Sequence, residues 1–225
     1  MTTTYLAADW DRLGGTFLDA IGDTLVMVTL TMVLGGIGGL LIGLLLYTSR
    51  AGGILQSKPI YWVLNILVNF VRPIPFIILI AMLAPLTLQV IGTTIGRSAA
   101  IFIMCIAAAF AVARIVEQNL VAIDPGVIEA ARAMGASPWR IIRTVIIPEA
   151  LGPLVLGYTF IFIAVVDMSA MAGYIGGGGL GDFAIVYGYR AYDLEVTYAA
   201  VIVIVIIVQI AQLFGNWLSR RILRR

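Results

Sequence analysis

The chain has 225 residues, of which 61% are hydrophobic and only 12% are charged, and its formal net charge is +2. A water-soluble domain contains about 45–50% apolar and about 25% charged residues, so this composition excludes one and predicts that lipid surrounds the protein. A single cysteine, Cys105, excludes an intrachain disulfide. The absence of histidine removes the commonest metal ligand and the usual general base. We therefore expect no catalytic site, no metal site and, with no basic stripe in the chain, no nucleic-acid partner.

Five stretches reach the length of about 20 mostly apolar residues that a membrane-spanning helix needs. They cover residues 24–47, 60–88, 98–116, 150–174 and 194–217. The second stretch is interrupted by Pro73, Pro75 and Pro85, and proline kinks a helix by removing a hydrogen bond. We read it as one broken span. The sequence thus predicts an all-α membrane protein with five transmembrane helices in a single domain, residues 1–225.

Basic residues set the expected orientation, because they concentrate on the cytoplasmic side of membrane proteins. With the N-terminus outside, three basic residues fall outside: Arg12, Arg97 and Arg190. Ten fall in the cytoplasm: Arg50, Lys58, Arg114, Arg132, Arg140, Arg143, Arg220, Arg221, Arg224 and Arg225. This bias predicts an outer N-terminus and a cytoplasmic C-terminus. Residues 1–12 lack the basic start and apolar core of a signal peptide, so we expect the first span to be retained.

Glycines recur at every fourth residue of the first span, at Gly35, Gly39 and Gly43. Such spacing allows another helix to approach closely. Packing within one chain is favoured over a dedicated seam between two copies.

The cytoplasmic loop at about 124–148 carries signals for two short helices. Asp124 is a good N-cap, and Pro125 suits the first helical position. Gly135 suits the left-handed residue that ends a helix. Ser137 then caps a second helix, which is expected to stop before Pro148. Two capped helices joined at a glycine corner predict a compact knob on the membrane surface, rather than a solvated connector.

The first of these helices, over 127–134, is expected to present small side chains beside a charged pair. The small residues are Ala130, Ala131 and Ala133, and the charges are Glu129 and Arg132. Small residues let a helix enter a groove on a partner, while charges fix its register. The knob is therefore a candidate docking site for another protein.

The run from Glu129 to Gly135, Glu-Ala-Ala-Arg-Ala-Met-Gly, is followed by Val-Ile-Ile-Pro at 145–148. This pattern resembles the EAA signature of the inner-membrane permeases of bacterial ABC importers, with Val145 and Ile147 replacing its Ile and Leu. The resemblance implies a type I importer permease in which this loop is the coupling helix that docks on a separate ATPase. The implied coupling residues are Glu129, Ala130, Ala131, Arg132, Met134 and Gly135.

Similarity to the methionine-importer permeases extends over nearly the whole chain. It is carried by residues 69–79 (Asn-Phe-Val-Arg-Pro-Ile-Pro-Phe-Ile-Ile-Leu), by 132–136, by Ser169-Ala170-Met171, by 178–181 and by Tyr187-Gly188-Tyr189. The resemblance implies a homodimer of this chain in the bacterial inner membrane, two ATPase copies and an extracytoplasmic substrate-binding protein.

ATP and Mg²⁺ would be bound by the ATPase, with no cofactor on this chain. The only lysine, Lys58, follows no glycine-rich phosphate loop, so the Walker A pattern is missing here.

Asp167 is the charge expected in the middle of a span, where insertion costs about 2.5–3.5 kcal/mol. Such residues usually face the interior of the bundle or a water-filled path. We expect Asp167 to line a translocation path with Ser169 and Met171, and to pair with substrate or with an arginine such as Arg72 or Arg114. Methionine permeases usually carry a small uncharged residue at the Asp167 position, which leaves the substrate open. For Arg72, anchoring of the broken span is the alternative interpretation.

Six glycines follow the fourth span, at Gly173, Gly176, Gly177, Gly178, Gly179 and Gly181. They predict a mobile external loop near a gate or a binding protein, or simple flexibility.

Two other functions compete with a methionine permease. A permease for another amino acid or small solute would share every feature above. A secondary transporter would use the intramembrane charge and the broken span, but it leaves the knob unexplained.

Overall fold

The computed structural model describes residues 9–223, all of whose regular structure is helical. Four helices are long and apolar enough to cross a membrane: Trp10–Ser49, Arg97–Val121, Pro138–Ile175 and Leu194–Leu223. A fifth crossing is available if α2 (Lys58–Val71) and α3 (Phe76–Ile91) form one broken span. The predicted all-α class with five spans is confirmed. Two predictions depend partly on residues outside the described range. They are the absence of a signal peptide, which was judged on residues 1–12, and the cytoplasmic placement of Arg224 and Arg225.

The first helix, α1 (Trp10–Ser49), begins well before the predicted start of its span at residue 24. Its early turns are not apolar enough for a membrane span. They are helical because Trp10, Leu13 and Phe17 pack against a buried cluster of the same unit. The indole N–H of Trp10 also donates a hydrogen bond to Glu195 at 2.9 Å.

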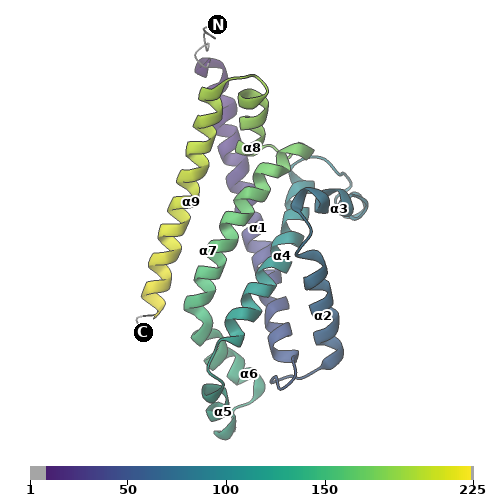
Figure 1. Cartoon of the computed structure of the whole chain (residues 1–225), viewed down its shortest axis with the longest axis vertical. Helices are drawn as coiled ribbons and strands as arrows, with labels where there is room; N and C mark the ends of the chain where they lie inside the picture. Colours follow the sequence, from purple (N-terminus) through teal and green to yellow (C-terminus); the bar gives the residue numbers. More distant parts are fainter. Residues whose placement is uncertain (1–8, 224–225) are drawn as a thin grey trace. The chain divides into compact units, whose positions relative to one another are not determined.

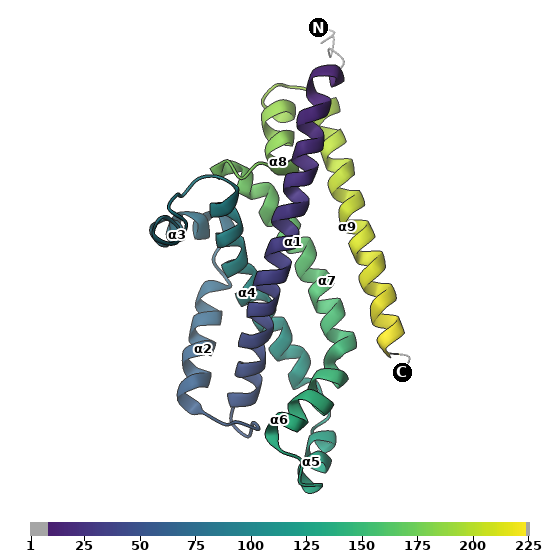
Figure 2. The same ribbon diagram turned by 180° about the vertical axis from the view of Figure 1, so that it is seen from behind.

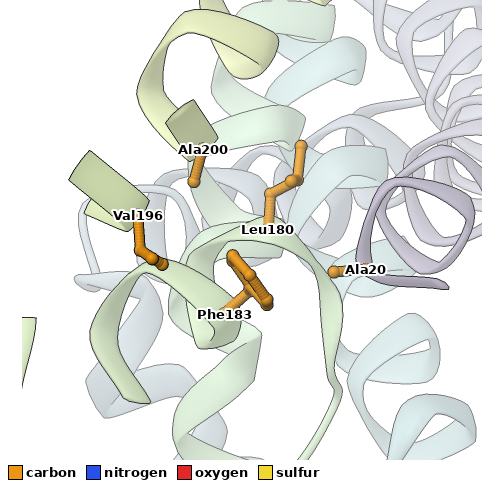
Figure 3. Packing of buried hydrophobic residues seen from close by; sticks show 5 residues of the cluster. All are labelled: Ala20, Leu180, Phe183, Val196 and Ala200. Atoms are coloured by element: carbon orange, nitrogen blue, oxygen red, sulfur yellow. The ribbon is translucent and has the colours of Figure 1, made fainter. Parts of the chain in front are cut away.

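The chain divides into two compact units. The first takes in 75–106 and 162–211 together with the described residues up to Val33. Its core joins α1 to α8 (Gly179–Phe183) and to α9 (Leu194–Leu223). The members shown in Figure 3 are Ala20, Leu180, Phe183, Val196 and Ala200. This cluster holds the short helix α8 beside the early turns of α1, as Figure 2 shows.

The second unit takes in 34–74 and 107–161 together with the described residues from Gln212 onward. In Figure 1 its helix α2 runs beside the later turns of α1. Leu46, Val68 and Ala113 form a buried cluster there, which joins α1 and α2 to α4 (Arg97–Val121).

Glycines bring α1 and α4 into close contact in this unit. A Cβ added at Gly39 would lie 2.5 Å from the Cβ of Val112, and one at Gly43 would lie 2.6 Å from the carbonyl oxygen of Ala113. Gly39 and Gly43 therefore serve packing within the chain, which is the interpretation favoured from the sequence.

The later helices follow without long loops. They are α5 (Pro125–Ala133), α6 (Pro138–Ile141), the widened π-helical turn η1 (Ile142–Ile146), α7 (Ile147–Ala172), the 3₁₀ turn η2 (Gly173–Ile175), α8, the π-helical turn η3 (Ala184–Tyr189) and α9.

Candidate functional site

The first helix of the knob, α5, begins and ends as its sequence predicts. The Asp124 carboxylate accepts a hydrogen bond from the Gly126 N–H at 2.8 Å, with Pro125 at the first position. At the other end Gly135 adopts φ +76°, a left-handed conformation. The Gly135 N–H donates to the Arg132 carbonyl at 2.9 Å, and the Ala136 N–H donates to the Ala131 carbonyl at 3.1 Å. These two bonds form the Schellman motif that closes a helix.

The second helix, α6, begins as predicted but does not stop before Pro148. The Ser137 hydroxyl accepts a hydrogen bond from the Arg140 N–H at 3.4 Å. The chain then passes through η1 directly into α7, so a single helical rod runs over Pro138–Ile175. Pro148 lacks the N–H that an α-helix would use, and the widened turn just before it carries the chain past that position. The predicted break is therefore wrong.

The exposed surface of the knob is apolar at its tip. Met134 is 80% exposed and Trp139 is 65% exposed, while Ala130 and Ala133 are also on the surface. Ala131 is only 4% exposed, which corrects the expectation that all three alanines face outward. Figures 1 and 2 show α5 and α6 together at one end of their unit. Trp139 was missed as a surface residue, although a tryptophan in a polar loop is itself a signal of contact.

The charged pair of α5 faces a hollow of about 100 Å³ beside the last turn of α1. Glu129 and Arg132 line this hollow with Tyr47 and Arg50. The Arg50 guanidinium lies over the Tyr47 ring, 4.4 Å from its centroid. Among the described residues neither Glu129 nor Arg132 forms an ion pair. Both charges are exposed and available to a partner.

The predicted path residues on α7 divide between two of its faces. Asp167 and Met171 are exposed and lie one helical turn apart, so they share a face. Ser169 is buried, and its hydroxyl donates to the Val166 carbonyl at 2.7 Å. The structure therefore brings Asp167 and Met171 together, while Ser169 points into the packing of its unit.

The two arginines suggested as partners of Asp167 have other surroundings. The Arg114 Nη1 atom lies 2.7 Å from Oε2 of Glu117, with which it forms an ion pair. Arg72 is the exposed C-cap of α2, and its N–H donates to the Val68 carbonyl at 3.1 Å. The alternative interpretation of Arg72, at a helix end of the broken span, fits this position. Within residues 9–223, Asp167 forms no ion pair.

The glycine-rich segment after α7 is packed rather than open. The Leu180 N–H donates to Thr24 Oγ1 at 2.8 Å, and the Gly96 N–H donates to the Ile175 carbonyl at 2.7 Å. A Cβ at Gly181 would lie 2.3 Å from the Ala170 Cα. These glycines permit close contact of backbones, which sequence spacing within the segment could not distinguish from flexibility.

Comparison with known proteins places these features in context. Residues 39–225 match the family model described as binding-protein-dependent transport system inner membrane component. The probable D-methionine transport system permease protein MetI of Vibrio cholerae is 39% identical over 216 residues, which are 96% of each chain. The methionine import system permease protein MetP of Bacillus subtilis is 41% identical over 181 residues, covering 80% of this chain and 82% of that one.

Solved structures agree. An inward-facing structure of the MetNI methionine ABC transporter has a chain that matches with a TM-score of 0.90 and 39% identity. The match covers 94% of this chain and 98% of that one. A chain of an amino acid ABC transporter crystallised with histidines has the same fold, with a TM-score of 0.80 and 24% identity over 98% of this chain and 100% of that one.

Proposed function

Because this chain belongs to the family of binding-protein-dependent transport system inner membrane components, we propose that it is the membrane-spanning permease subunit of an ATP-driven methionine importer. The assignment of methionine as the substrate rests on the similarity, over 96% of both chains, to a relative named for D-methionine transport. The family description places it in an inner membrane. The fold is that of a type I importer permease.

We propose the knob as the site where the ATPase docks. Its surface combines the large exposed side chains of Met134 and Trp139 with small Ala130 and Ala133, and small residues let a helix enter a groove on a partner. Glu129 and Arg132 flank this surface and would fix the register of docking. Gly135 sets the angle between α5 and α6, while Ala131 supports α5 from within.

The assembly proposed is two copies of this chain, two ATPase subunits and an extracytoplasmic binding protein. The chain itself is proposed to catalyse nothing, because its single lysine follows no phosphate-binding loop. ATP and Mg²⁺ would be bound by the ATPase. We also propose one transmembrane permease domain over 1–225, with its N-terminus outside and its C-terminus in the cytoplasm, on the ten-to-three distribution of basic residues given above.

For translocation we propose the exposed face of α7 that carries Asp167 and Met171, with Ser169 as a buried support behind it. An exposed carboxylate within a span is costly in lipid and fits a water-filled path better. Arg72, at the end of α2, is proposed to border the path or to anchor the broken span.

Native mass spectrometry tests the class of protein. The chain is tagged and gently extracted from the membrane of its own host. A pair of copies carrying two copies of an ATP-hydrolysing subunit is the expected species. A species that reproducibly lacks an ATPase under mild detergent would contradict the proposal and favour a secondary transporter.

Uptake competition tests the substrate. Labelled methionine uptake that unlabelled methionine abolishes, and that other amino acids leave unchanged, is expected. Uptake that a different amino acid competes away more strongly would favour the second candidate, a permease for another small solute. The charge at Asp167 is the observation that keeps this candidate open.

A further inference from the structure

A second hollow, of about 120 Å³, lies in the first unit where α7 gives way to the helices that precede α9. It is lined by Gly173, Tyr174, Asp182, Ile185, Val186 and Arg190. Gly173 and Tyr174 are at the end of the candidate span Pro138–Ile175, and the other lining residues are in the connection between this span and Leu194–Leu223. In the proposed orientation this connection faces the outer side, from which a substrate arrives.

Opposite charges face this hollow without neutralising each other. Asp182 is in the first turn of α8 and Arg190 is the C-cap of η3. Among the described residues the carboxylate and the guanidinium form no ion pair. Burial raises the pKa of the Asp182 carboxyl, and the charge of Arg190 only opposes this effect. The carboxylate is thus partly desolvated and lacks a cation in direct contact.

The backbone around Asp182 is held firmly. Leu180 and Phe183 are buried in the cluster of Figure 3, and the Leu180 N–H is bonded to Thr24. On the other side, a Cβ at Gly173 would lie 2.8 Å from the Cβ of Asp182. The absence of a side chain at Gly173 therefore lets Asp182 lie against the end of α7. A site built on a pinned helix keeps its geometry when a ligand binds.

We infer that this hollow binds the zwitterionic head of a free amino acid, its ammonium group on Asp182 and its carboxylate on Arg190. Each contact would be a charge-assisted hydrogen bond, and a guanidinium can hold a carboxylate through two parallel bonds. Tyr174, Ile185 and Val186 provide an apolar surface for the amino-acid side chain. The identity of the amino acid as the transported substrate rests on the proposed function, whereas recognition of its head does not.

Equilibrium binding to the purified protein tests the inference. The full chain is extracted with the subunits that stay bound to it and placed in lipid nanodiscs without a binding protein. Labelled methionine, leucine and glutamine are the probes. N-acetylmethionine, which lacks the ammonium charge, and methionine methyl ester, which lacks the carboxylate, compete for the site. Asp182→Asn and Arg190→Gln are compared with Asp19→Asn and Arg12→Gln, which make the same changes at exposed residues of α1 in the same unit.

The expected result is that each of the two site variants weakens binding at least tenfold, while the two α1 variants bind like wild type. Asp182→Glu and Arg190→Lys, which keep the charges, should recover part of the loss. Both blocked analogues should compete poorly. Melting temperatures of all variants show whether any of them has unfolded. If a neutral variant has unfolded, the binding of the charge-keeping variants is compared with that of wild type instead.

Equal binding by wild type and site variants would overturn the inference, as would wild-type protein that binds none of the three amino acids. Methionine uptake by the wild-type importer is measured separately. Intact methionine uptake by wild type, with unaltered binding in the variants, refutes amino-acid binding at the hollow and leaves the proposed function standing. Absent methionine uptake, with charge-dependent binding of leucine or glutamine, refutes the methionine assignment alone and supports the hollow.

Discussion

The backbone N–H of Ala136 reaches back across Gly135 to the carbonyl oxygen of Ala131, at 3.1 Å. This bond requires the residue between α5 and α6 to be left-handed, and Gly135 is so at φ +76°. Nothing lies within 4 Å of a Cβ added there, so the constraint is one of backbone conformation rather than of space. The shape of the docking knob therefore depends on one dihedral angle.

Gly135→Val should strain this corner by about 1–2 kcal/mol and displace α5 relative to α6. Asparagine tolerates the left-handed region better, so Gly135→Asn should retain most of the wild-type behaviour. Thermal unfolding and co-purification of the ATPase measure the two effects. Gly15→Val, on an exposed helical turn with open space around it, is the control for the same change in side chain. Normal stability and normal transport in Gly135→Val would contradict the role of the corner.

Glu129→Lys should weaken docking of the ATPase, because it reverses an exposed charge on the surface proposed to meet it. The loss should be largest at low salt and should shrink as salt screens the charges. Pull-down of the ATPase at two ionic strengths measures it. Asp19→Lys, which makes a similar change at an exposed residue of α1 in the other unit, should leave docking intact. Retention of the ATPase by both variants at low salt would refute the assignment of Glu129.

Gly39→Ala should destabilise the second unit by about 1–3 kcal/mol, because the added methyl group would overlap α4. Its Cβ would lie 2.6 Å from the Ala109 carbonyl oxygen, which cannot move aside as a flexible side chain can. Gly38→Ala is a matched control, since its Cβ would meet the Ala109 Cβ at an ordinary 3.7 Å. Comparing the denaturation of the two variants in detergent checks the prediction, which fails if they are equally stable.

Asp167→Asn should reduce methionine uptake while leaving assembly with the ATPase unchanged. The carboxylate is exposed and has no ion-pair partner within residues 9–223, so its removal breaks no contact of that kind. Initial uptake rates and the composition of the purified complex are the two measurements. Wild-type uptake with unchanged assembly would remove Asp167 from the path.

Tyr192→Gly should raise the unfolding free energy by up to about 1 kcal/mol. Tyr192 is the one non-glycine residue of the described chain with positive φ, at +58°, and its side chain is exposed. Relief of left-handed strain exceeds or matches the entropy lost by glycine on folding. Tyr189→Gly, at an exposed residue inside η3, should destabilise instead. A melting temperature that falls in both variants would show that Tyr192 is not strained.

The caps and the glycine corner of the knob were read correctly from the sequence, whereas the helix end expected before Pro148 was not. Asp124, Gly135 and Ser137 act within three residues of themselves, so their roles as caps and corner followed from residue type alone. Ala131 could not be assigned in the same way, because its burial depends on how the knob folds back on its own unit.

The role of the glycine-rich segment after α7 could not be predicted from the sequence either. A glycine chosen for flexibility and one chosen for close approach look identical in a sequence. The close contact between Gly181 and Ala170, across the turn after α7, shows that the glycine allows two backbone segments to approach each other. Likewise the early start of α1 depends on Phe17, whose ring lies 5.1 Å from that of Phe183, a residue far along the chain.

The π-helical turn at Ile142–Ile146 has a mechanical meaning for the knob. Since α6, this turn and α7 form one continuous helical rod, a force applied at Trp139 passes along the helix into its membrane-spanning part without an intervening loop. A π-turn holds one residue more than an α-turn, so deleting a single residue from it should restore a regular α-helix and leave its two ends facing nearly as before. Deleting one residue from the regular helix α7 should instead rotate the knob by about 100° relative to the membrane-spanning part of the rod.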